Sequence, residues 1–156
     1  MRETVRYSVH VPFWELEHYL TRNTLARAMG IPSRRYFADI HNHQVRGPWA
    51  ALVPEGIIYH HCFLEWFVGG RWLKAMSSFD RSLSEVLGWC LVEFSAQADA
   101  LLPAADLAGQ PYITYLHRHG WRLGVPLEEF LRVTEEVYGV SIVEGWKSLS
   151  LEGGRG

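Results

Sequence analysis

The sequence predicts an α+β domain with a mainly antiparallel sheet and few helices, and three observations carry this prediction. Residues 34–43 alternate between two sets of side chains, as a strand with two different faces does. A long run of β-branched and aromatic residues over 57–68 meets Gly69-Gly70 and then a second run over 71–79, which is typical of a hairpin with a two-residue turn. The third observation is helical spacing of apolar residues towards both ends of the chain.

The clearest helical spacing lies in residues 13–29, and Gly30 with Pro32 beyond it predicts where that helix ends. The other elements are predicted from the same apolar spacing and from the positions of glycine and proline. They are a strand over 1–12, a loop over 46–56, a short helix over 82–87 ended by Gly88, a loop over 89–110, a strand over 112–116 and a helix opened by Pro126 and closed by Gly139.

Composition limits the class of protein. The chain has 156 residues, 48% hydrophobic and 21% charged, which suits one domain over 1–150 with a frayed tail over 151–156. Lys and Arg total 15 against 17 for Asp and Glu, without a basic run, so we expect no nucleic-acid partner. No apolar stretch approaches the roughly 20 residues of a membrane span, and we expect a cytoplasmic protein with no membrane partner. Two cysteines are too few for a disulfide framework.

Two segments resemble motifs of the transglutaminase-like superfamily, in the same order. The helix over 13–29 leads into Leu25-Ala-Arg-Ala-Met-Gly-Ile-Pro-Ser-Arg34, and the hairpin reads His61-Cys-Phe-Leu-Glu65-Trp-Phe-Val-Gly-Gly-Arg-Trp72. In that family the first segment ends the helix of the nucleophilic cysteine, and the second carries the catalytic histidine. The resemblance covers about residues 15–138. It implies a papain-like core, with the N-terminal helix packed on the sheet, and His61 as the catalytic histidine.

The chain departs from the family at the other two catalytic positions. The family's cysteine would fall on Glu15, and no cysteine precedes Cys62. The family's aspartate would fall on Met76. Only His61 of the Cys-His-Asp triad is therefore present, and acyl transfer through a thiol is not expected.

Strand alternation decides which side chains can meet His61. Adjacent side chains of a strand point apart, so Cys62 lies on the opposite face and is interpreted as a buried core thiol. The two-residue turn pairs His61 with Ser78 and places Asp80 diagonally on the same face. Asp80 either orients the imidazole or caps the helix that follows, and both interpretations stay open.

Glu15 would lie at a helix N-terminus facing His61, where free backbone N–H groups stabilise a carboxylate. Glu15 and His61 would then form an acid–base pair, with Asp80 as the third catalytic group. The alternative is that Glu15 is an acidic first-turn residue on a solvated helix. The side chains expected to line a substrate pocket around this pair are Trp14, His18, Phe37, Asp39, His41, His43, Tyr59, Phe63, Met76 and Ser78.

A metal site is the third hypothesis. Asp39, His41 and His43 share one face of the strand over 34–43, and with His61 or His18 they would offer ligands for zinc or iron. The same arrangement arises in any alternating strand. The pair His117 and His119 is interpreted as polar surface.

The expected function is cofactor-free acid–base catalysis on a small apolar molecule: cyclisation, isomerisation, or elimination and hydration, in a niche such as secondary metabolism. Two alternatives stay open, a non-catalytic pseudoenzyme that binds a ligand and a metal-dependent hydrolase or transferase at the Asp39/His41/His43 cluster. A small-molecule substrate is the expected partner, and whether the chain forms a homo-oligomer is left open.

Overall fold

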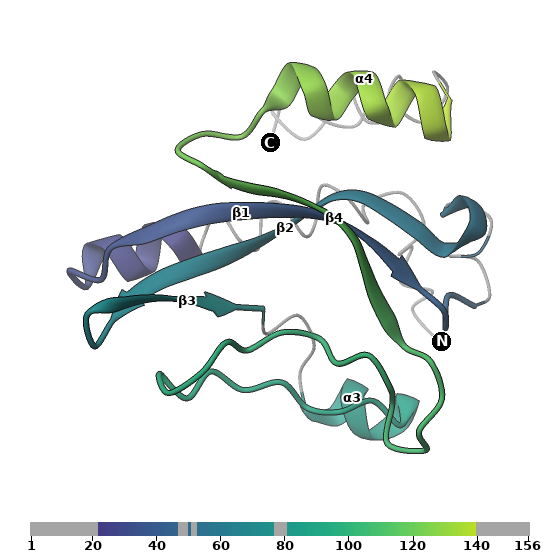
Figure 1. Cartoon of the computed structure of the whole chain (residues 1–156), viewed down its shortest axis with the longest axis horizontal. Coiled ribbons are helices and arrows are strands. Elements are labelled where there is room, and N and C mark those ends of the chain that lie inside the picture. Colours follow the sequence, from purple (N-terminus) through teal and green to yellow (C-terminus); the bar gives the residue numbers. More distant parts are fainter. Residues whose placement is uncertain (1–21, 47–49, 51–52, 77–80, 140–156) are drawn as a thin grey trace, which may run out of the picture.

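The protein is an α+β domain built on a four-stranded antiparallel sheet (Figure 1), as the sequence predicts. The structure is a computed structural model that describes residues 22–46, 50, 53–76 and 81–139. The strand order is β3-β2-β1-β4, so β1 is central. The elements are β1 (Ser33–Asn42), the 3-10 turn η1 (Pro54–Gly56), β2 (Ile57–Val68), β3 (Arg71–Ala75), α3 (Arg81–Leu87), β4 (Ile113–Arg122) and α4 (Leu127–Tyr138).

The predicted hairpin is confirmed with its register. Val68 pairs with Arg71 across Gly69-Gly70, and the pairing continues to Leu64 opposite Ala75. Both turn glycines have positive φ angles, 60° and 80°, which a two-residue turn of this kind requires. The predicted partners Ser78 and Asp80 lie outside the described residues, as do Trp14, Glu15 and His18 and the expected strand over 1–12.

The helix that precedes β1 ends where the glycine signal predicts. Residues 22–28 are helical, and Gly30 follows with a φ of 78°. The N–H of Ile31 donates to Ala26 O (2.9 Å) and that of Gly30 to Arg27 O (3.0 Å), a pair of bonds that satisfies the last carbonyls of a helix. Arg27 also donates twice to Ser33 O, which fixes the helix end against the start of β1.

β4 differs from the expected strand over 112–116, because it runs on to Arg122. It pairs with β1 from Asn42–Ile113 to Arg35–Arg122, with two shifts of register. Gly120 lies within the longer strand with a φ of 86°, next to a shift of register.

The core lies around the central strands. Figure 1 shows α4 on one side of the sheet, and α3 with the segment over 88–112 on the other. The buried cluster joins β1, β2 and β4 with Met76, which follows β3, and with the segment after Gly88. Its members are Phe37, Ala38, Ile40, Cys62, Phe63, Leu64, Met76, Leu102, Tyr112 and Ile113. None of the helices described is long and apolar enough to span a membrane.

A polar chain ties the segment over 88–112 to the end of β1. Asp106 Oδ2 accepts a hydrogen bond from Gln44 Nε2 (2.7 Å), and Gln44 Oε1 accepts one from Trp89 Nε1 (2.8 Å). The Trp89 ring in turn stacks on the buried ring of Tyr112, with centroids 5.0 Å apart. This chain fixes an irregular segment that has few ladder bonds of its own.

Replacing Asp106 is expected to change how stability depends on pH. Hydrogen bonds from the Gln110 backbone, the Gln44 side chain and the Ala108 backbone, with the charge of Arg46, hold the pKa of Asp106 below its ordinary value. A lowered folded-state pKa stabilises the fold above the unfolded pKa, and this contribution is lost as the pH falls through the folded pKa.

Asp106→Asn should therefore lower the Tm at pH 7, and the difference from wild type should shrink below about pH 4, the ordinary range of an aspartate pKa. Thermal unfolding followed by circular dichroism between pH 2.5 and 7 measures it. A difference that stays constant over this range would show that the charge of Asp106 adds nothing to stability.

Candidate functional site

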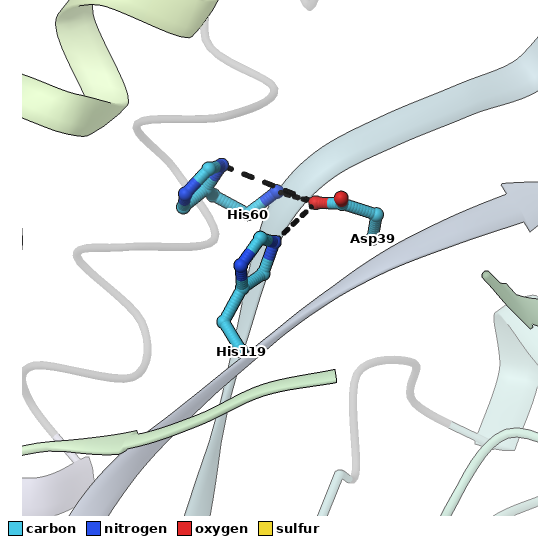
Figure 2. A group of neighbouring side chains, drawn as sticks. All are labelled: Asp39, His60 and His119. Carbon is cyan, nitrogen blue, oxygen red and sulfur yellow. Dashed lines mark hydrogen bonds and ion pairs between the residues drawn. The ribbon is translucent and has the colours of Figure 1, made fainter. Parts of the chain in front are cut away.

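Asp39, His60 and His119 converge from three adjacent strands, β1, β2 and β4 (Figure 2). His119 Nε2 lies 2.8 Å from Asp39 Oδ1, and His60 Nδ1 lies 3.9 Å from the same oxygen. The backbone N–H of His60 also donates to Asp39 Oδ1, at 2.9 Å. The two imidazoles stack with centroids 4.3 Å apart and planes 17° from parallel. We call these three residues the imidazole–carboxylate centre.

Irregular pairing on both sides of β1 creates this centre. Ala38 pairs with His61 but Ile40 pairs with Ile58, so β2 has one residue more than β1 between these pairs, at Tyr59-His60. On the other side Phe37 pairs with Gly120 and Ala38 with Arg118, which leaves His119 as an extra residue of β4. Such bulges redirect side chains and are common beside functional sites. Both bring an imidazole to Asp39.

His60 adopts a backbone conformation that its residue type rarely takes. Its φ is 52°. The other described non-glycine residues with positive φ, Glu55 and Ala96, lie outside the four strands. A left-handed residue within a strand costs free energy and persists where the surrounding structure requires it. This strain belongs to the same bulge that turns His60 towards Asp39.

A second carboxylate reaches the centre from α4. Glu129 Oε1 lies 3.1 Å from His60 Nε2, and its side chain is about half exposed. The hydrogen bond with His60, followed by electrostatic interactions with His60, His119 and Arg122, lowers the pKa of Glu129. The first turn of α4 therefore supplies a carboxylate that contacts His60 Nε2.

The hydrogen bonds at Asp39 assign the proton of His119. An ionised carboxylate only accepts hydrogen bonds, so His119 donates through Nε2. The other nitrogen, Nδ1, is then the basic nitrogen of the neutral ring. The side chain of His60 is 5% exposed, whereas those of Asp39 and His119 are 14% and 17% exposed. The centre is thus shielded but open on the side of His119.

His61 lies deeper than its neighbour. It is buried opposite Ala38, and its ring centroid is 6.2 Å from that of Phe63. Cys62 is buried on the other face, where it pairs with Phe37. From His61 to Val68 the ladder is regular, so the separation of His61 and Cys62 by strand alternation applies there.

The structure places several of the expected pocket residues in the core. Phe37, Phe63 and Met76 are at most 1% exposed and belong to the buried cluster. Tyr59 lies half-buried within the bulge of β2. These positions support the strands that carry the centre.

His41 and His43 form a separate pair. Their ring centroids lie 3.9 Å apart, and His43 Nε2 is 2.8 Å from Thr114 Oγ1. Asp39 meets His60 and His119 rather than His41 and His43. The structure therefore gathers a different set of ligands around Asp39 from the set expected along one strand.

Glu65, the glutamate of the hairpin motif, belongs to a buried ion network. Its carboxylate contacts Arg34 Nε at 2.6 Å and Lys74 Nζ at 3.5 Å. The Arg34 guanidinium lies over the rings of Trp72 (4.0 Å) and Trp121 (4.9 Å). This network joins β1, β2, β3 and β4 at the regular end of the sheet, and its charges pair with one another.

His60 and His119 are the residues that the sequence analysis missed. The interpretation of His119 as polar surface is wrong, because its ring is largely buried and bonded to Asp39. His117 is exposed, as expected. A signal was present: Tyr115, His117, His119 and Trp121 alternate, which continues the strand beyond Leu116. Nothing in the spacing predicts the two bulges.

No protein-family model, curated protein or solved structure matches this chain.

The strain at His60 predicts a contrast between two substitutions. Asn tolerates the left-handed region, whereas a β-branched residue there is a genuine outlier. His60→Asn and His60→Val both remove the imidazole, but His60→Val should lose about 1–2 kcal/mol more of unfolding free energy. Urea denaturation of the three proteins measures the difference. Equal stability of the two variants would mean that the backbone relaxes and that φ of His60 is not imposed by the sheet.

Proposed function

We propose that the chain is an enzyme of transglutaminase-like ancestry that no longer uses a thiol and carries out acid–base catalysis on a small molecule at the imidazole–carboxylate centre. The observation that carries the proposal is the convergence of Asp39, His60 and His119, with Glu129 at 3.1 Å from His60. Imidazoles beside carboxylates are the groups that most often transfer protons near neutral pH.

The arrangement offers two different proton-transfer groups. His119 is held by Asp39 through Nε2, so Nδ1 acts as the general base. His60 Nε2 lies against Glu129, and this pair acts as the general acid that returns a proton. Reactions that need both steps without a covalent intermediate are isomerisation, cyclisation, and elimination or addition of water. The substrate approaches from the side of His119 and Glu129, which are the more exposed members.

The position of the cysteines supports a mechanism without a thiol. Cys62 is buried on the strand face opposite His61, and its Sγ lies 4.0 Å from Phe63 O. Cys90 Sγ lies 3.9 Å from Ala105 O in the irregular segment. A reactive thiol needs an adjacent base or a cationic environment. His61, which the family resemblance implies as catalytic, is tested alongside the centre.

The decisive experiment compares histidine and cysteine variants on a panel of small substrates. The panel contains enones, epoxides, lactones and β-hydroxy acids, and products are followed by mass spectrometry. Because general acid–base groups contribute about 10²- to 10⁴-fold, His119→Gln and His60→Asn should each lower kcat by that range. His117→Gln is the matched control on the same strand, and Cys62→Ser and Cys90→Ser should leave kcat within about twofold.

Three results would contradict the proposal. Loss of turnover in Cys62→Ser or Cys90→Ser, with the fold retained, would restore thiol chemistry. Loss in His61→Ala with normal rates in His60→Asn and His119→Gln would move catalysis to His61. Ligand binding without turnover across the panel would favour the non-catalytic binding domain.

A further inference from the structure

We propose that Asp39, His60 and His119 bind one divalent transition-metal ion, with zinc or ferrous iron as the class of ion. Among the residues that the structure describes, this is the one group of three or more His, Cys, Asp or Glu side chains whose donor atoms converge, all within 4.8 Å of one another. Two imidazoles and one carboxylate are a ligand set that zinc and ferrous iron accept. The proposed metal site is the same centre as in the proposed function, but metal binding is measured without a substrate.

The distances suit an ion after small side-chain movements. In a tetrahedral site with metal–ligand bonds of about 2.0–2.1 Å, neighbouring ligand atoms lie about 3.3 Å apart. The distances from Asp39 Oδ1 are 2.8 Å to His119 Nε2 and 3.9 Å to His60 Nδ1, which lie on either side of that value. An ion between them would take the place of the proton at His119 Nε2, and in the neutral ring that proton would move to Nδ1.

A buried nitrogen of His60 gives independent support. In the described part of the chain, His60 Nδ1 has no hydrogen-bond partner, although the side chain is 95% buried. A buried polar atom without a partner costs free energy unless a ligand or ion satisfies it. Figure 2 shows this nitrogen directed at Asp39, the same carboxylate that His119 contacts.

Glu129 would hold one ligand of such a site, His60, in place. It contacts the opposite nitrogen of His60, Nε2, and so orients the ring while Nδ1 faces the ion. Three protein ligands leave a fourth position for water, as in catalytic rather than structural zinc sites. The ion would therefore act in the hydration, elimination or hydrolysis reactions named above.

The test measures metal binding by the full chain, prepared without a polyhistidine tag. Zn²⁺ is titrated in competition with a chromogenic chelator, and Co²⁺ is used as a spectroscopic probe of a four-coordinate site. We expect one ion per chain and an absorption spectrum typical of low-coordinate Co²⁺. X-ray absorption of the Zn²⁺ complex should count two imidazole ligands.

Ligand variants and controls make the test specific. Asp39→Asn, His119→Gln and His60→Asn should weaken Zn²⁺ binding by at least about 100-fold, since even outer-shell changes cost 10- to 100-fold. His60→Asn keeps a residue that tolerates positive φ, so it separates the loss of a ligand from the loss of the fold. His43→Ala and His117→Gln, which lie outside the converging group, should bind as the wild type does.

Three results would overturn the inference: no stoichiometric binding by the wild type, unchanged affinity in the three ligand variants, or loss of binding in His43→Ala. The last result would return the site to the strand of Asp39, His41 and His43.

Failure of the metal site is distinct from failure of the proposed function. Absence of stoichiometric Zn²⁺ binding, with turnover retained, would reject the metal site and keep acid–base catalysis. Specific Zn²⁺ binding without turnover would keep the metal site and reject the enzyme.

Discussion

The carboxylate of Asp39 is the constraint on which the centre of the sheet depends. It lies on the middle strand, between two strands that each carry extra residues at its level. A bulge leaves backbone groups that the ladder does not pair, and a buried N–H without a partner is costly. Asp39 Oδ1 accepts the N–H of His60 and the ring of His119 together. One side chain therefore stabilises both irregular strands and gathers their imidazoles.

The sheet has two ends with different electrostatics. At the regular end Glu65 lies between Arg34 and Lys74, so buried charges neutralise one another within hydrogen-bond distance or nearly so. Such a network holds the strands in register. Because its charged groups are already paired, a ligand would gain little binding free energy from them. At the bulged end two imidazoles share one carboxylate, and a buried nitrogen of His60 lacks a hydrogen bond. Reactivity is therefore expected at the bulged end.

Local signals explain how much of this could be predicted from the sequence. The Gly69-Gly70 hairpin and the helix stops at Gly30, Gly88 and Gly139 were predictable, because a glycine with positive φ acts on its own neighbours. The bulges were not, because period-2 alternation assumes one residue opposite each residue. The sequence singled out Asp39, but the partners that the structure gives it come from β2 and β4, up to 80 residues away in the chain.

The two adjacent histidines show what a motif does and does not determine. The resemblance selects His61, yet the extra residue at Tyr59-His60 turns His60 towards Asp39 while His61 packs beside Phe63. In a strand, adjacent side chains have opposite directions, so a shift of one residue exchanges their surroundings. Counting along the motif therefore locates the adjacent histidines His60 and His61 in the chain. The hydrogen-bond pairing of the strands decides which of the two side chains faces Asp39. A catalytic role carried over by residue count holds only where the ladder is regular, and here it becomes irregular one residue before His61.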